Sequence, residues 1–448
     1  MNTTVPRGIV VLSLLATTLV VVQLARMSVY MWQPTAAAWS VAPWNSFATA
    51  HSCLSGYWAA ARQIDTDPDV WSDDLRLEPA AAPGVRRVPR RIGPFTYDSY
   101  EYTPTFLLLP RALAHVTPDF FALRQLWFVI NVVAVLAAVF AIARRLAPAA
   151  GPAVLWLAPL VLAPMSVLAT FQAGNVQLAC IAVSLLAMLA FERAHAGGEE
   201  QLRSRAAGGL LLAFMTVSKL YPGLLVCYLL LRRDWIAAAW TISIGLLLAI
   251  VGFLDMGLPA HEAFLHHLPR LLSGESFPNL YVPTGIAANM SVPGIVRKLT
   301  LYGVPNAGFG AMGLVGWIYT AAVLAVVVQL ARRPLPPAFE PVAWIVILLL
   351  ATLRSPALPV YGIFPVMWLV AIVLAVRWHD VPLRTTLLVL AVLLVGVAPG
   401  QTLVPPTVQA VFSTLVQTGG AIAVTVVALR TARLSGPVAV PAAGTARR

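Results

Sequence analysis

An apolar run that ends in two arginines decides the fold class: residues 124–145 read RQLWFVINVVAVLAAVFAIARR. A run of about 20 apolar residues is long enough to cross a bilayer as a helix. Such runs recur along the 448 residues, of which 59% are hydrophobic and 11% charged, and the mean hydropathy is +0.80. We therefore predict an all-α integral membrane protein whose residues 1–448 form a single transmembrane domain.

Pairs of arginines at the ends of the apolar runs predict how the chain crosses the membrane. Arg144–Arg145, Arg232–Arg233 and Arg332–Arg333 each follow such a run, and positively charged short loops stay in the cytoplasm. Placing all three pairs inside gives about twelve transmembrane helices with both termini in the cytoplasm, including a tail at 431–448. The first run, about 8–32, is too long for a signal peptide and is expected to remain as an anchor. The protein is thus predicted to be a multi-pass protein of the plasma (inner) membrane.

Two polar segments are predicted to lie on the outer, extracytoplasmic side, at 33–123 and 256–309. Within the first, residues 105–116 are apolar but too few to cross the membrane, and Pro104 and Pro110 interrupt them. Such a short apolar segment is typical of a re-entrant or interfacial helix. The first outer loop is therefore expected to contain helices that lie against the membrane surface.

Charge and cysteine content exclude several other classes. The net charge is +12, but the arginines cluster in short loops between apolar runs, so they indicate membrane topology rather than nucleic-acid binding. The three cysteines, Cys53, Cys180 and Cys227, imply no disulfide framework. No internal repeat suggests an inverted-repeat transporter.

Four cations are candidates for binding a lipid phosphate on the outer side. Lys219, in Ser218–Pro222, ends a span and is one of only two lysines; the alternative is a lysine that extends to the interface. His267 and Arg270 belong to the second outer loop, and Arg354 lies between two apolar runs. These last three are equally compatible with solvated positions. Neighbouring histidines point to different faces of a helix, so no metal site is predicted.

The amides Gln172 and Asn175 flank a hinge between two apolar segments. Because amides both donate and accept hydrogen bonds, they suit recognition of sugar hydroxyls. A role in capping the following helix explains them equally well.

Two acids of the first outer loop are candidates for a general base. Asp98 and Glu101 lie in YDSYEYTP, residues 97–104, directly before the short apolar segment. A carboxylate there could remove the proton of an acceptor hydroxyl, and the aromatic faces of Tyr57, Trp58 and Tyr102 could stack on sugar rings. The alternative is that Asp98 caps a helix and the tyrosines form an interfacial belt.

Four short pieces resemble glycosyltransferase family 87 of the GT-C superfamily. They are Tyr57–Ala61, Tyr100–Pro104, Gln172–Asn175 and Ser218–Pro222, and their order and spacing match over about residues 40–330. The resemblance implies an enzyme that takes a sugar, most often mannose, from a polyprenyl monophosphate. The acceptor would be a lipid or a cell-envelope glycan on the outer face.

One departure from the family pattern concerns the base. Members usually carry an aspartate four residues before the tyrosine of the first piece, and here that position is Cys53. His51, Asp98 or Glu101 is then expected to act instead. A lipid monophosphate needs little charge compensation, so neither a metal nor another cofactor is expected. The alternatives are a lipid-linked sugar flippase or other transporter, and a family member that has lost catalysis.

Overall fold

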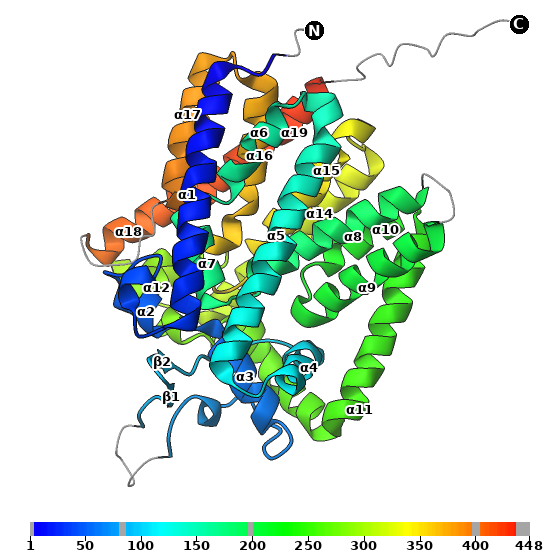
Figure 1. The fold of residues 1–448 in the computed structure, drawn as a ribbon. Coiled ribbons are helices and arrows are strands. Elements are labelled where there is room, and N and C mark those ends of the chain that lie inside the picture. Colours follow the sequence, from blue (N-terminus) through cyan, green and yellow to red (C-terminus); the bar gives the residue numbers. More distant parts are fainter. Residues whose placement is uncertain (1–3, 80–86, 196–199, 397–403, 436–448) are drawn as a thin grey trace, which may run out of the picture.

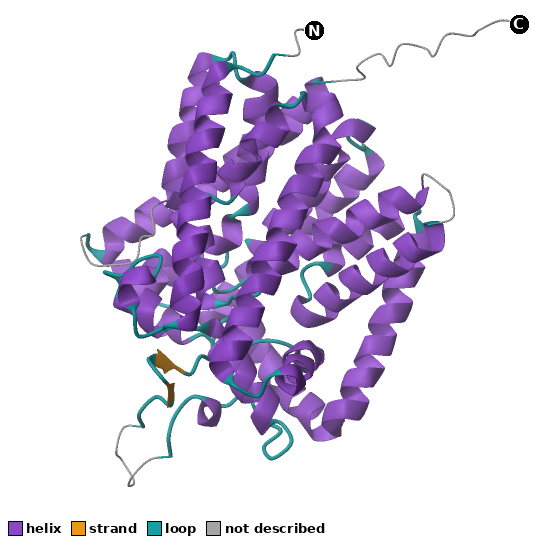
Figure 2. Ribbon diagram, viewed as in Figure 1, coloured by secondary structure: helices purple, strands orange, loops and turns teal. Residues whose placement is uncertain are grey.

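The computed structural model describes residues 4–79, 87–195, 200–396 and 404–435. The described chain is almost entirely helical, with one hairpin of strands β1 (Arg91–Ile92) and β2 (Phe95–Thr96) (Figures 1 and 2). This confirms the predicted all-α membrane protein. Of the predicted tail at 431–448, residues 436–448 lie outside the described residues.

Seven helical segments of the described chain are long and apolar enough to cross a membrane. A bent pair, Ala153–Val161 with Met165–Ala173 at 57°, would make an eighth. The predicted number of about twelve is not confirmed. The seven are α1 (Arg7–Trp32), α5 (Phe120–Ala150), α8 (Gln177–His195), α11 (Trp235–Ser273), α14 (Phe309–Arg332), Val360–Arg377 with α16 (Pro365–Arg377), and Pro406–Leu434 with α18 (Pro406–Phe412) and α19 (Gly419–Leu434).

Several predicted spans are shorter helices that pack within the bundle. An apolar run can be a core helix as well as a span, because both bury every face. In α15 nearly every residue is buried. The α-helices outside the seven segments are α6 (Ala153–Leu157), α7 (Met165–Ala173), α9 (Gln201–Lys219), α10 (Gly223–Leu231), α15 (Glu340–Thr352) and α17 (Val381–Ala391). Short 3₁₀ turns are η4 (Ala158–Val161), η7 (Pro337–Phe339) and η8 (Val360–Ile363). The π-helical turns are η9 (Val392–Gly396) and η10 (Ser413–Thr418).

The first polar segment folds into short helices at one end of the bundle, together with the hairpin (Figure 1). The apolar stretch after Pro104 becomes a short helix, as predicted. Arg111 fixes it by ion pairs to Asp65 at 3.0 Å and to Asp255 of α11 at 2.9 Å. The elements are η1 (Ala37–Trp39), α2 (Ser46–Ala50), α3 (Cys53–Gln63), η2 (Asp73–Leu75), η3 (Pro104–Leu107) and α4 (Leu108–Val116).

Helix α11 consists of two helices joined at a break, and the break lies at the start predicted for the outer segment 256–309. Where a loop was predicted after this break, residues 258–273 form a second helix. Gly257, with φ of 76°, breaks the axis, and Pro259 follows at a position where a new helix tolerates its missing N–H. The chain therefore changes direction and continues as a helix. The rest of the segment holds η5 (Pro278–Tyr281), α12 (Pro283–Ala288), α13 (Gly294–Lys298) and η6 (Leu299–Tyr302).

The arginine-rich ends gather at the other end of the bundle. Arg145, at the end of α5, pairs with Glu192 of α8 at 2.8 Å and also donates to the carbonyl of Pro337. Arg232, after α10, lies 3.6 Å from Glu340 at the start of α15. These ends therefore share one side, which the predicted topology requires of them.

Candidate functional site

A cavity of about 700 Å³ lies where the first polar segment meets the bundle. Its walls come from α3, from residues 97–103, from the start of α8, from the break between α9 and α10, from α11 and α14, and from residues 351–361. Eight of the twelve side chains proposed from the sequence line it: His51, Tyr57, Asp98, Glu101, Tyr102, Asn175, Lys219 and Arg354.

The segments around His51 and Asp98 are held together by the backbone. His51 forms a parallel bridge with Thr96, and the N–H of Asp98 donates to the Ser55 hydroxyl at 3.0 Å. Helix α3 can approach this closely because residue 56 is glycine: a Cβ there would lie 2.9 Å from the carbonyl oxygen of Asp98. The structure thus places both segments on one wall of the cavity.

Packed aromatic rings support this wall of the cavity. The hydroxyls of Tyr57 and Tyr102 lie 2.7 Å apart, and the Tyr102 ring stacks on Phe106 at 4.7 Å. Trp71 donates its indole N–H to the carbonyl of Tyr102 at 2.8 Å. Burial raises the pKa of both tyrosines well above the usual range, so their hydroxyls stay neutral. Both side chains are buried, 1% and 7% exposed, so their main effect is to make this wall of the cavity rigid.

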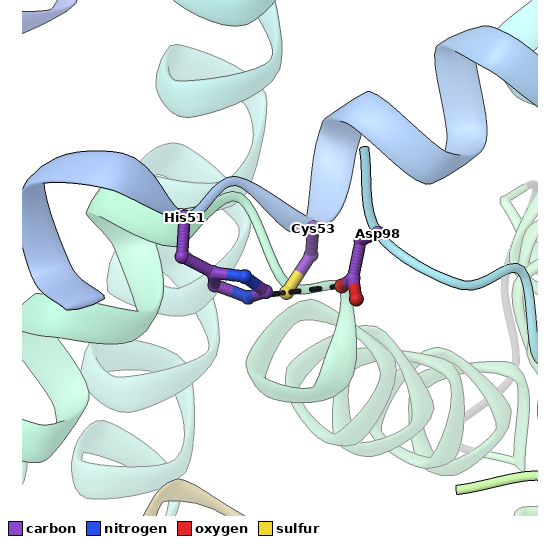
Figure 3. A group of neighbouring side chains, drawn as sticks. All are labelled: His51, Cys53 and Asp98. Carbon is purple, nitrogen blue, oxygen red and sulfur yellow. Dashed lines mark hydrogen bonds and ion pairs between the residues drawn. The ribbon is translucent and has the colours of Figure 1, made fainter. Parts of the chain in front are cut away.

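His51, Cys53 and Asp98 point toward one another (Figure 3). His51 Nε2 lies 3.3 Å from Cys53 Sγ and 3.7 Å from Asp98 Oδ2. Burial, and then the neighbouring carboxylate, raise the pKa of the Cys53 thiol. The thiol by itself is therefore no substitute for a carboxylate base, and the Asp98 carboxylate lies beside it instead.

Lys219 and Arg354 bring positive charge to the cavity. Lys219 donates to Gln177 Oε1 and lies 5.0 Å from the Tyr102 ring. Arg354 donates to the Thr320 hydroxyl at 3.0 Å and lies over the Trp317 ring. Within the described residues neither cation forms an ion pair with an acid. Cations that face a cavity without a carboxylate partner suit an anionic ligand.

Glu101 and His267 are hydrogen-bonded to each other. His267 Nε2 lies 3.0 Å from Glu101 Oε2, and both side chains are nearly buried. Burial raises the pKa of Glu101, although the hydrogen bond to His267 opposes the shift. His267 does not line the cavity, and Arg270 is exposed outside it. Neither of the two cations proposed from the second polar segment therefore reaches the cavity.

Two other proposed residues have roles in the fold. Gln172 is buried and does not line the cavity; its amide accepts from Val41 N–H and donates to the Ala48 carbonyl, both at 2.7 Å. This ties the first polar segment to α7. Trp58 packs against Phe120 and beneath the Arg62 guanidinium, also outside the cavity lining.

Gln177, Tyr221 and Tyr361 are among the polar residues of the cavity wall that were not proposed as site residues from the sequence. Gln177 donates to the Tyr221 hydroxyl at 3.1 Å, and Asn175 donates to the Tyr361 hydroxyl at 3.0 Å. Gln177 follows the hinge amide by two residues, which was an available signal. Tyr361 had none, since nothing local distinguishes it from other interfacial tyrosines.

The family model of glycosyltransferase family 87 matches residues 100–356, more than half of the chain. The chain belongs to glycosyltransferase family 87. Membership, together with the apolar helices, makes it a multi-pass membrane glycosyltransferase. No curated protein and no solved structure matches the chain. The family match begins at Tyr100, so His51, Cys53 and Asp98 precede the part that it covers.

Proposed function

We propose that this family 87 protein transfers a sugar from a polyprenyl monophosphate to a hydroxyl of a lipid or cell-envelope glycan at the outer face of the membrane. Mannose is the sugar that the family resemblance favours. The observation that carries the proposal is that one cavity holds two cations and a candidate base. Lys219 and Arg354, which have no acidic partner in the described chain, line the same cavity as Asp98.

In the proposed reaction the acceptor oxygen attacks the anomeric carbon while the bond from that carbon to the phosphate oxygen breaks. The leaving lipid phosphate gains negative charge, which Lys219 and Arg354 stabilise because they are already fixed in place. The acceptor hydroxyl loses its proton to a base on the opposite side of the reacting carbon. Tyr57 and Tyr102 line the cavity but expose little ring area, so they shape the wall beside the sugar rather than offer it a stacking face.

Asp98 fits the role of base better than Glu101. The Asp98 side chain is 30% exposed and its Oδ2 faces His51, whereas the Glu101 side chain is 13% exposed and bonded to His267. A base must reach its substrate within hydrogen-bond distance, and a carboxylate that already holds a buried partner is less available. His51 would then orient Asp98.

The proposal is tested with purified protein in liposomes, radiolabelled polyprenyl-phosphomannose and a membrane lipid extract. Wild-type protein is expected to transfer label to the lipid fraction. Lys219→Ala is expected to lower the rate about 100-fold, the usual effect of losing one fixed group that stabilises developing charge. Arg270→Ala is the matched control, since that cation lies outside the cavity.

Each outcome bears on a separate part of the proposal. Absence of transfer from this donor contradicts the donor class. Equal losses in Lys219→Ala and Arg270→Ala contradict the phosphate site, and label that crosses the bilayer without transfer supports a flippase.

A further inference from the structure

Three different donor atoms converge on one point at the cavity wall. They are the imidazole Nε2 of His51, the sulfur of Cys53 and a carboxylate oxygen of Asp98, and all lie within 4.8 Å of one another (Figure 3). All three line the cavity, and Cys53 is the most buried of them, at 5% exposed. Nothing in the transfer chemistry described above requires a thiol here.

The arrangement does not fit a proton relay. In a relay, one ring nitrogen of the histidine faces the nucleophile and the other faces the carboxylate. Here the same nitrogen, Nε2, faces both Cys53 Sγ and Asp98 Oδ2. One nitrogen holds at most one proton, so it cannot take a proton from the thiol while the carboxylate orients the other side of the ring.

The geometry points to a zinc ion bound by His51, Cys53 and Asp98. Tetrahedral zinc holds nitrogen at about 2.0–2.1 Å, thiolate sulfur at about 2.3 Å and carboxylate oxygen at about 2.0–2.2 Å. Ligand atoms at those lengths stand about 3.3–3.6 Å apart. The observed distances from Nε2, 3.3 Å to sulfur and 3.7 Å to oxygen, fall close to this spacing. A thiolate in the set favours zinc over magnesium or calcium.

Each ligand is oriented by a neighbour, as metal ligands usually are. Asn175 Nδ2 lies 3.4 Å from Cys53 Sγ and can donate to a thiolate. The His51 ring stacks on Phe47, with centroids 4.4 Å apart and planes 17° apart. Asp98 Oδ1 accepts from the N–H of Ser99 at 3.0 Å, which leaves Oδ2 toward the other two ligands.

Three protein ligands leave one position of a tetrahedral site open, as in zinc sites that act on a substrate. All three ligands line the cavity, so the open position is available to an oxygen from the cavity. A coordinated hydroxyl gives up its proton to solvent more readily than a free one. Binding the acceptor hydroxyl in this way rests on the proposed function and replaces its free base: with zinc bound, Asp98 is a ligand, and the proton of the coordinated hydroxyl goes to solvent. The metal site itself does not rest on the proposed function.

The site is tested by metal analysis of the purified full chain, carrying an affinity tag without histidines. Wild-type protein is expected to hold about one zinc per chain. Cobalt(II) exchanged into the site is expected to give the near-ultraviolet absorption of a thiolate–cobalt bond. Cys53→Ala and His51→Ala are expected to lower bound zinc at least tenfold and to abolish that absorption.

The other two cysteines supply matched controls. Cys180→Ala and Cys227→Ala are expected to keep both the zinc and the cobalt absorption, because Cys180 and Cys227 belong to no metal-ligand cluster of the described residues. If Cys53→Ala does not fold, the wild-type cobalt spectrum still decides: absence of a thiolate absorption overturns the site. Zinc retained in a folded Cys53→Ala also overturns it.

The outcomes separate this inference from the proposed function. Zinc bound through Cys53 without sugar transfer supports the site and contradicts the function. Sugar transfer by protein that binds no zinc supports the function and overturns the site.

Discussion

A hollow lies at each end of helix α8, and the two hollows differ in whether their cations form ion pairs with acids of the protein. At the His195 end, a hollow of about 480 Å³ holds Glu192, Arg232 and Glu340. There Arg232 lies 3.6 Å from Glu340, and His195 lies 3.2 Å from Asp234. At the Gln177 end, the larger cavity holds Lys219 and Arg354, which form no ion pair with an acid in the described chain.

We expect a ligand at the hollow whose cations lack acidic partners. A buried or partly buried cation is stable when a carboxylate or a ligand anion faces it. At the His195 end acids pair with Arg232 and His195, and Arg233, which has no ion pair in the described chain, is exposed to solvent, so the fold itself explains this hollow. At the Gln177 end neither Asp98 nor Glu101 pairs with Lys219 or Arg354, and cations left without an acidic partner suit an anionic substrate. Charged side chains line both hollows, so the presence of charge alone would not distinguish them.

The largest effect on sugar transfer is expected from removal of the proposed base, Asp98. Asp98→Asn is expected to lower kcat for sugar transfer about 1,000-fold, within the range typical of lost general-base catalysis. Glu101→Gln, whose carboxylate is already bonded to His267, is expected to change kcat less than about tenfold. A larger loss in Glu101→Gln than in Asp98→Asn would reverse the assignment of the base.

The second test compares the loss of an arginine from each of the two hollows. Arg354→Ala is expected to lower the transfer rate about 100-fold, since it removes a group that stabilises developing charge. Arg232→Ala is expected to leave the rate within about twofold and to lower stability by about 0.2–1 kcal/mol, the usual value of a partly exposed ion pair. Rates in liposomes and thermal unfolding in detergent give the two readouts. Equal effects on rate would remove the distinction between the hollows.

Local patterns in the sequence predicted the fold class and eight of the side chains that line the cavity. The apolar runs indicated α1, α5 and α14, because span length and hydrophobicity are properties of contiguous residues. Lys219 and Asp98 were found for a similar reason: each is unusual in its own neighbourhood. The start predicted for the second outer segment, residue 256, coincides with the break in α11 at Gly257, but the helix that follows the break as far as Ser273 was not predicted.

Contacts between distant residues could not be predicted in the same way. Glu101 and His267 are 166 positions apart, and Gln172 bonds to the backbone of Val41 and Ala48, 131 and 124 positions away. Both side chains looked available for a substrate because their partners are set only by tertiary packing. Cys53 was interpreted as the loss of a base, and its place beside His51 and Asp98 is visible only in the folded chain.

The close approach of α3 to the Asp98 backbone can be tested at Gly56. In Gly56→Ala the new methyl would lie 2.9 Å from the Asp98 carbonyl oxygen and 3.0 Å from that of Ser99. The backbone must move, and overpacking of this kind costs about 1–3 kcal/mol. Thermal unfolding is expected to show that loss, with a further loss of transfer activity as Asp98 shifts. Unchanged stability and activity would mean that the cavity wall does not depend on this contact. Ser55→Ala, which removes the hydrogen bond to Asp98 N–H, serves as the milder comparison.

The smallest expected effect is the pH dependence of the Glu101–His267 pair, in which an acid of the cavity wall faces a histidine, as Asp234 faces His195 at the paired hollow. Burial raises the pKa of Glu101 above its unfolded value, so the folded state binds the proton more tightly than the unfolded state does. Stability from this group is then fully present below the unfolded pKa and is lost as pH rises through the folded pKa. The amide in Glu101→Gln has no such proton to lose, so the stability of wild-type protein relative to this variant should fall as pH rises from the acid range toward neutrality. Thermal unfolding of both proteins across that range measures the difference. A difference that stays constant or grows with pH would show that His267 compensates the buried charge fully, and Glu101 would then belong with the satisfied pairs of the other hollow.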